Sequence, residues 1–281
     1  MLASRIVVCF VFFSLVGWVF ESAYCSITEK RWCNRGFLFG PVCPIYGVGA
    51  VAAIAVFGNA AVQRSIPPAW VVFLVCAAGA SAIEWVTSVA MERLFGAVWW
   101  DYSNMPLNLK GRVCVPAAAL FGLAGCAITY LVVPALSRIN GQLDPLAVEV
   151  ASLVLTALVA ADATLTVCTL TEVLAAVEQL EAEFDSRMQA AVEAVPEIVP
   201  DISAGLQSRA NALREDGERR MDRVREGGAE HAERIRELAG RMGARQSHIL
   251  HNARRFSSRR TGAAARRLSE ALDALAKKGR K

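Results

Sequence analysis

Three acidic residues interrupt otherwise apolar stretches of the sequence, and they are the residues best placed to do chemistry. Glu21 closes the first stretch, Glu84 lies in the third and Asp162 lies near the middle of the fifth. An ionisable side chain inside a membrane span is costly, so it usually serves a binding site, an ion pathway or an internal ion pair. We therefore expect these acids either to bind a ligand or to hold helices together.

Basic residues and one more acid lie in the segments that connect these stretches. Asp101 is expected to pair with Arg35 or Arg112, because all three should lie on one side of the membrane. Glu21 and Glu84 should lie at similar depth near that side. The predicted polar cavity has six candidate residues: Glu21, Arg35, Glu84, Asp101, Arg112 and Asp162. It would hold an ion, a solute or a lipid headgroup, and the alternative is a structural cluster of ion pairs.

Other kinds of chemistry have little support in the sequence. It contains no G-x-x-x-x-G-K-[ST] loop, no nucleophile elbow and no H-E-x-x-H motif. None of the eight cysteines forms a C-x-x-C pair, and His248 and His251 have no third metal ligand beside them. We therefore predict no catalytic residue, no metal and no cofactor. A permease built on this chain would need a separate ATPase subunit.

Five apolar stretches are long enough to position these residues in a bilayer. About 20 apolar residues cross the roughly 30 Å hydrocarbon core as a helix, and lipid offers no hydrogen bonds to irregular backbone. Hydrophobic residues make up 54% of the chain, which exceeds the usual share of about 45–50% in soluble domains. The expected spans are residues 6–24, 44–62, 69–91, 113–136 and 146–170. We predict an all-α polytopic membrane bundle of about five transmembrane helices.

Two of these stretches have alternative interpretations. The first could be a signal peptide with Arg5 as its charged end, but Glu21 and Tyr24 stand where a cleavage site needs small residues. The fifth is the most polar, because it holds Glu149 and Asp162. A four-span body with a partly buried amphipathic helix is the alternative to five spans.

The domains and their orientation follow from the distribution of charge. We expect a transmembrane domain over residues 1–172 and a charged helical tail over residues 173–281. Lys and Arg in short loops favour the cytoplasmic side. One side would carry Lys30, Arg31, Arg35, Arg93, Lys110 and Arg112, and the other Arg5, Arg64 and Arg138. We therefore predict an outside N-terminus, a cytoplasmic C-terminus, and reduced thiols at Cys33, Cys43 and Cys114.

Two connecting segments are rich in Gly, Pro and aromatic residues. The first suits a segment that dips into the membrane interface or into a buried cavity, and a packed turn with aromatic anchors is the alternative. The Trp and Tyr side chains of the second favour the headgroup level. The motif residues are Asn34, Gly36, Gly40, Pro41, Pro44 and Tyr46 in the first segment, and Trp99, Trp100, Tyr102, Asn108 and Gly111 in the second.

Four long motifs lie in and beside these segments. They are Gly17-Trp18-x-x-Glu21, Asn34-Arg35-Gly36 through Tyr46-Gly47, Glu84-Trp85-x-Thr87-Ser88, and Trp99-Trp100-Asp101-Tyr102-Ser103 through Asn108-Leu109-x-Gly111-Arg112. Together they resemble the putative ABC-transporter type IV family over about residues 12–125, and residues 254–275 look like that family's usual ending. The resemblance implies a multi-pass protein of the bacterial cell membrane and, through the family's name, a permease.

The tail has two parts that differ in charge. Pro196 and Pro200 should divide its first helix from a longer, solvated one, whose apolar seam is interrupted at Gly228 and is not expected to form a stable long coiled coil. The final part holds Arg254, Arg255, Arg259, Arg260, Arg266, Arg267, Lys277, Lys278, Arg280 and Lys281. Its expected apolar face consists of Phe256, Leu268, Leu272 and Leu275. We expect it to bind anionic inner-leaflet lipid rather than nucleic acid, and a disordered basic end is the alternative.

Three classes of function remain. A transport protein is favoured by the polar residues inside the spans and by the family resemblance. A membrane scaffold or regulatory protein would use the long tail to recruit a partner. A membrane enzyme would act on a lipid or headgroup through Glu21, Glu84 or Asp101. Each of these three classes is compatible with a homo-oligomer.

Overall fold

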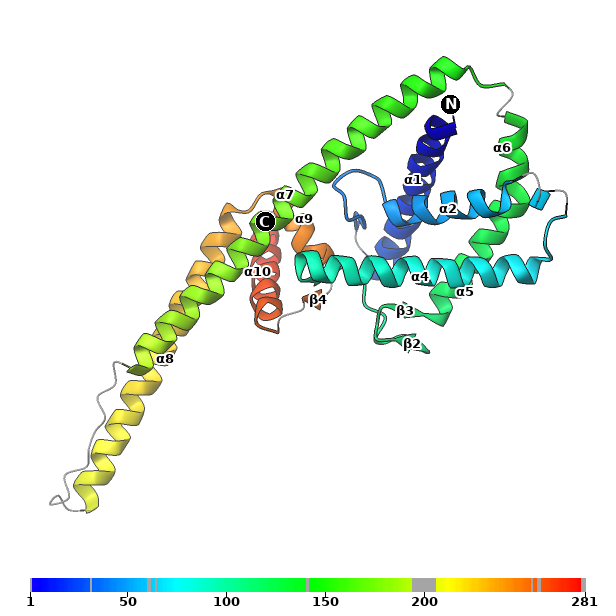
Figure 1. Cartoon of the computed structure of the whole chain (residues 1–281). Coiled ribbons are helices and arrows are strands. Elements are labelled where there is room, and N and C mark those ends of the chain that lie inside the picture. Colours follow the sequence, from blue (N-terminus) through cyan, green and yellow to red (C-terminus); the bar gives the residue numbers. More distant parts are fainter. Residues whose placement is uncertain are drawn as a thin grey trace. The chain divides into compact units, whose positions relative to one another are not determined.

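A computed structural model gives the fold and describes residues 2–30, 32–59, 62–63, 65–139, 142–193, 206–253, 255–256 and 259–278 (Figure 1). Helices account for most of this part of the chain, so the predicted all-α class is confirmed. The chain divides into two compact units. The first unit is Met1–Thr171 with His251–Ser257, and the second is Glu172–Leu250 with Ser258–Lys281.

Four helical segments of the described chain are long and apolar enough to cross a membrane. They are Leu2–Glu29 (α1), Ala69–Phe95 (α4), Val115–Ile139 (α5, η1 and α6 together) and Pro145–Arg187 of α7. Helix α7 itself runs over Pro145–Glu193, well past the expected end of the fifth span at residue 170. These segments confirm a polytopic helical body.

Helix α2, Pro44–Phe57, is shorter than the span expected over residues 44–62. Its 14 residues are about 21 Å long, less than the thickness of a typical hydrocarbon core. The helix ends there because the Asn59 side chain donates to the Val56 carbonyl oxygen (2.8 Å) and accepts from the Val62 backbone N–H (3.0 Å). Residues 60, 61 and 64 lie outside the described residues. The count of five spans therefore stays a prediction.

The fourth expected span consists of three helical pieces. Helix α5 covers Val115–Ala127, a π-helical turn η1 covers Ile128–Val132, and α6 covers Val133–Ile139. Pro134 has no backbone N–H and so cannot complete the regular pattern of hydrogen bonds at this point. Short π-helical turns of this kind are frequent at functional sites.

Small residues let the helices of the first unit approach closely. Helix α1 packs against α2, and α4 packs against α5. The backbone of Gly125 on α5 meets the side chain of Cys76 on α4 so closely that a Cβ atom would not fit. Close backbone contact at small residues is the usual way for membrane helices to associate, because lipid already solvates apolar side chains.

Short strands, which the sequence did not predict, connect the segments between the helices. Strand β2 (Asn108–Leu109) pairs antiparallel with β3 (Val113–Cys114), forming a small hairpin. Strand β1 (Ala97–Val98) pairs antiparallel with β4 (Arg255–Phe256). This second pair shows that a segment near the end of the chain returns to the first unit.

The second unit is built from the C-terminal part of α7 and from α8 (Leu206–Arg241), α9 (Ala244–Asn252, most of it) and α10 (Arg259–Lys278). The ring centroids of Phe184 and His231 lie 4.3 Å apart. Arg187 Nη1 forms an ion pair with Glu230 Oε2 at 2.9 Å. Burial and the charge of Arg267 lower the pKa of His231.

The second unit bears on two expectations about the tail. Leu268, expected on a membrane-facing surface, is only 1% exposed, because α10 packs against α8. The apolar seam of the longer tail helix includes Met221 and Ile235. Ile235 is buried whereas Met221 is exposed, so the seam is in contact along part of its length. The expected breaks at Pro196 and Pro200, and the basic residues Arg254, Arg280 and Lys281, lie outside the described residues.

Candidate functional site

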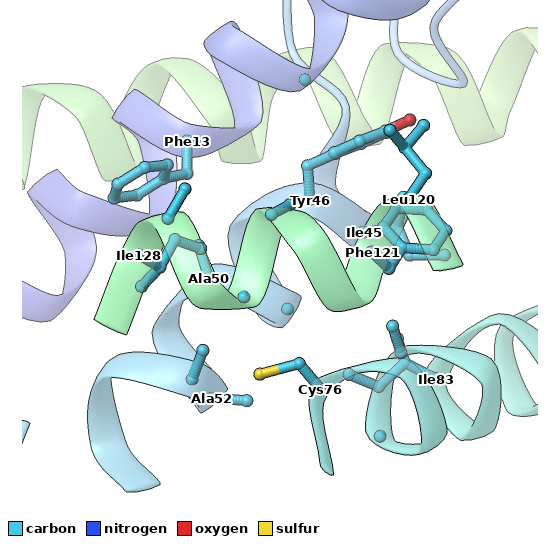
Figure 2. Close-up of a pocket in the computed structure, with 18 of the residues that line it drawn as sticks. Phe13, Ile45, Tyr46, Ala50, Ala52, Cys76, Ile83, Leu120, Phe121 and Ile128 are labelled. Carbon is cyan, nitrogen blue, oxygen red and sulfur yellow. The ribbon is translucent and has the colours of Figure 1, made fainter. Parts of the chain in front are cut away.

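A pocket of about 450 Å³ lies among helices α1, α2, α4 and α5 and the turn η1 (Figure 2). Its wall is mostly apolar, as Figure 2 shows for Phe13, Ala50, Ile83, Phe121 and Ile128. The volume falls within the range of small-molecule binding sites. Because these helices are expected to span the membrane, the pocket lies inside the part of the protein that the sequence assigns to the membrane.

Glu84 is the acid in the lining of this pocket, and one of its two carboxylate oxygens accepts a hydrogen bond. The residue is 4% exposed, and its Oε1 atom accepts a hydrogen bond from the Tyr102 hydroxyl at 3.1 Å. Its Oε2 atom is buried and has no hydrogen-bond partner within the described part of the chain. A buried polar atom without a partner is rare in proteins and calls for an explanation such as a ligand.

A second acid and tyrosine lie beside this pair. The Tyr46 hydroxyl donates to Glu21 Oε1 at 2.5 Å, and the Tyr46 ring lines the pocket with its centroid 5.7 Å from that of Phe121. Burial raises the pKa of Tyr102, and the negative charges of Glu84 and Glu21 add to that effect. The two acid–tyrosine pairs, Glu21–Tyr46 and Glu84–Tyr102, therefore form one electrostatic cluster.

Asp162 of α7 lies in a different environment, because its carboxylate is held by the first connecting segment. The backbone N–H of Phe39 donates to Oδ1 at 3.2 Å, and that of Gly40 donates to Oδ2 at 2.9 Å. A Cβ atom on residue 40 would lie 2.8 Å from Oδ2, so the close approach depends on glycine. Asp162 thus fastens α7 to the loop before α2.

Asn34 organises the rest of the first segment. Its side chain accepts from Trp18 Nε1 at 2.6 Å and donates to the Phe39 carbonyl oxygen at 3.2 Å. Its own carbonyl oxygen accepts from the Asn252 side chain at 3.1 Å. The segment bends over residues 37–41, and Pro44 then begins α2. Leu38 is buried, so this segment packs against the protein rather than forming a free loop.

Arg35 connects the first segment to the second. Its Nη2 atom donates to the Trp99 carbonyl oxygen at 2.9 Å, and its backbone N–H donates to Ser22 Oγ at 3.2 Å. The rings of Phe37 and Trp99 meet edge to face with centroids 5.0 Å apart. These contacts hold the two motif-rich segments against each other.

Arg112 pairs with an acid that the sequence analysis did not single out. Its guanidinium forms an ion pair with Glu92, donates to Ser88 Oγ at 2.9 Å and lies 5.6 Å from the Trp85 ring centroid. Its carbonyl oxygen accepts from Trp100 Nε1 at 2.9 Å. Arg112 is therefore a structural brace between α4 and the second segment, in place of the expected pairing with Asp101.

Asp101 lies in an exposed turn of the second segment. Its Oδ1 atom accepts from the backbone N–H and the hydroxyl of Ser103, at 3.0 and 2.5 Å. Asn108 stabilises the neighbouring hairpin by accepting from the Gly111 N–H at 3.1 Å. Of the six candidate residues, Glu84 lines the pocket and Glu21 lies beside it through Tyr46, while Arg35, Asp101, Arg112 and Asp162 hold the connecting segments.

The apolar wall of the pocket is also recognisable in the sequence. Small side chains recur on α4 at Cys76, Gly79 and Ala80, and Ile83 continues the same helix face. A strip of small residues leaves space where larger side chains would fill it. Glu84 follows this strip directly, so the acid and the space could have been connected from the sequence.

The thiols of two cysteines approach one carboxylate in the first unit. The thiols of Cys25 and Cys33 donate to the two oxygens of Glu29, at 3.4 and 3.2 Å. The three possible ligand atoms lie within 4.8 Å of one another. Hydrogen bonding within the group accounts for this arrangement.

Comparison with known proteins gives one finding. A family model described as putative ABC-transporter type IV matches residues 8–167, which is more than half of the chain. The matched range contains the pocket, both acid–tyrosine pairs and Asp162. No curated protein and no solved structure matches the chain.

Proposed function

Because this chain belongs to the putative ABC-transporter type IV family, we propose that it is a permease subunit whose pocket receives an apolar solute. It is a transport-associated, multi-pass membrane protein. We propose that a separate subunit hydrolyses ATP, since the chain contains no G-x-x-x-x-G-K-[ST] loop. Glu84 and the apolar wall would hold the solute.

One observation carries this proposal: an apolar pocket in the helical body ends at a buried acid with one unpartnered oxygen. A purely structural acid is expected to use both oxygens, as Asp162 does with the backbone N–H groups of Phe39 and Gly40. A site that holds a solute transiently needs a polar group that becomes satisfied when the solute arrives. The turn η1 supports the same function, because Ile128 and Val132 of this irregular turn line the pocket.

The connecting segments supply the surface that a separate ATPase subunit would contact. Arg35, Phe37 and Trp99 join the two segments into one structure. The excess of Lys and Arg in these segments favours the cytoplasmic side, where ATP is available. We propose that this joined structure transmits movement between the ATPase and the pocket.

ATP-driven uptake into inside-out vesicles from native membranes tests the proposal. Radiolabelled decylamine, decanol and decanoate serve as apolar solutes of different charge. We expect ATP to drive uptake of at least one of them, and Gly79→Leu to reduce that uptake several-fold by filling the pocket. Val86→Leu, on the same helix but 65% exposed, is the matched control and should behave as the parent. Equal uptake in vesicles with and without the chain would contradict the proposal.

A second candidate function, a scaffold anchored at the inner leaflet, is favoured by the second unit. Arg266 and Arg267 are exposed on α10, and each basic residue near anionic lipid contributes about 1 kcal/mol. In nanodiscs, anionic lipid should protect the tail of the full chain from proteinase K several-fold. Substituting both arginines by Glu should remove that protection, and equal cleavage of both proteins would contradict a lipid-bound tail.

A further inference from the structure

We infer that the ligand of the pocket is a protonated lipophilic amine, whose N–H group donates to Glu84 Oε2 while its apolar body fills the space among α1, α2, α4 and α5. This inference rests on the proposed function in one respect, that the pocket is where the solute is held. It adds the chemical class of the solute and the atom that selects it.

The shape and composition of the pocket require an apolar body. Its volume is about 450 Å³, and its wall includes the rings of Phe13, Phe20, Phe57 and Phe121. Burying apolar surface against such a wall is favourable, because it removes that surface from water. Aromatic faces also attract cations, so this wall tolerates a positively charged head better than an aliphatic wall would.

The charge of the pocket favours a cation over an anion. Glu84 is the carboxylate in the described lining, and that lining holds no Lys, Arg or His. Glu21 lies close by and adds a second negative charge through the cluster described above. A carboxylate or phosphate head would meet these acids without a compensating base, and like charges in a low-dielectric site repel strongly.

The hydrogen-bond inventory narrows the class further. Tyr102 already donates to Oε1, so the vacant acceptor is Oε2. A protonated amine supplies both the charge and an N–H donor, which makes a charge-assisted hydrogen bond. A quaternary ammonium has the charge but no donor, and an alcohol has a donor but no charge. The expected order of affinity is amine, then quaternary ammonium or alcohol, then carboxylate.

The chain offers a separate variant for each half of the ligand. Glu84→Gln removes the charge but keeps a carbonyl oxygen that can still accept from Tyr102. Gly79→Leu fills the apolar space, because a Cβ atom on Gly79 meets nothing within 4 Å. Leu also has a higher helix propensity than Gly, so this change should not unfold α4. Val86→Leu again controls for added volume on the lipid-facing side of α4.

The test measures binding of radiolabelled decylamine to the full chain in nanodiscs by scintillation proximity. We expect saturable binding by the parent and by Val86→Leu. Affinity should fall at least about tenfold in Glu84→Gln, as expected when a charged hydrogen bond is lost, and also in Gly79→Leu. Unlabelled decyltrimethylammonium and decanol should compete at least about tenfold more weakly than decylamine, and decanoate should compete least.

The possible failures separate the two proposals. If decanol competes as well as decylamine, or Glu84→Gln binds as the parent does, the amine class is overturned. In that case, lost binding in Gly79→Leu would still support an apolar pocket and the proposed function. If Gly79→Leu and Val86→Leu both bind as the parent does, the pocket is not the site, and the inference falls with it. Size-exclusion profiles matching the parent confirm that each variant is folded.

Discussion

Among the acids in the apolar helices of this protein, Glu84 and Asp162 have opposite surroundings. Both oxygens of Asp162 accept backbone N–H groups, from Phe39 and Gly40. Glu84 has one oxygen bonded to Tyr102 and one with no partner among the described residues. From the sequence, both acids were predicted to line the same polar cavity. Their hydrogen bonds indicate that Asp162 fixes the structure and that Glu84 is available for a ligand.

The difference matters because a polar group is costly in a membrane protein unless it is satisfied. The protein offsets this cost at Asp162 with its own backbone. At Glu84 the cost is left in place, which is typical of functional sites that give up stability for binding. Substitutions should therefore affect the two acids in opposite ways, with stability lost at one and binding lost at the other.

The largest expected effect on stability is that of Asp162→Ala. The substitution leaves the N–H groups of Phe39 and Gly40 without their acceptors, so we expect a loss of about 2–4 kcal/mol. Reversible unfolding of the full chain in mixed micelles would measure it. Asp162→Asn keeps one acceptor oxygen and should lose less. Unchanged stability in Asp162→Ala would contradict a structural role for this acid.

Gly40→Ala should destabilise the same contact from the other side. Its Cβ atom would lie 2.8 Å from Asp162 Oδ2, and the resulting displacement should cost about 1–3 kcal/mol. The matched control is Gly49→Ala, where an added Cβ meets nothing within 4 Å. In an Asp162→Ala background, Gly40→Ala should cost little, because the clashing atom is gone. If the stability losses of the two single variants add up in the double variant, the proposed contact between Gly40 and Asp162 is contradicted.

Tyr102→Phe should have a smaller effect, of about 0.5–1.5 kcal/mol, because one hydrogen bond to Glu84 is lost. It also leaves Glu84 Oε1 without the Tyr102 donor, so decylamine binding should change along with stability. The corresponding variant of the neighbouring pair, Tyr46→Phe, removes the bond to Glu21 instead. A difference in ligand affinity between the two variants would sharpen the assignment of the ligand to Glu84.

Asp101→Asn should have the smallest effect, within about 0.5 kcal/mol of the parent. Asp101 is exposed, and the Asn side chain can still accept from Ser103. Normal binding and normal stability would agree with its place in a turn. Loss of transport in this variant would instead favour the polar cavity predicted from the sequence, in which Asp101 takes part.

Local sequence signals predicted much of the fold. Helix α2 begins at Pro44 and α4 at Ala69, as expected from the prolines that precede or open them. The early end of α2 depends on how the Asn59 side chain bonds to backbone groups, which composition does not reveal. Strand β4 pairs with a segment more than 150 residues earlier in the chain, and no local pattern encodes such a distant pairing.

The candidate site was predictable in its parts but not in its connections. The cost of placing an ionisable side chain in a membrane span singled out Glu21, Glu84 and Asp162 as candidate residues. Deciding which basic residue pairs with which acid requires the packing of α4 against the second segment, as the Arg112–Glu92 ion pair shows. Whether both oxygens of an acid accept hydrogen bonds likewise depends on backbone groups that come from distant loops.

A paired measurement of stability and of decylamine binding on Glu84→Gln and Asp162→Ala tests the contrast most directly. We expect Glu84→Gln to keep or raise the unfolding midpoint and to lose binding at least about tenfold. Asp162→Ala should lower the midpoint while its folded fraction binds with near-parent affinity. A Glu84→Gln protein that is destabilised yet binds normally would contradict the assignment of the two acids.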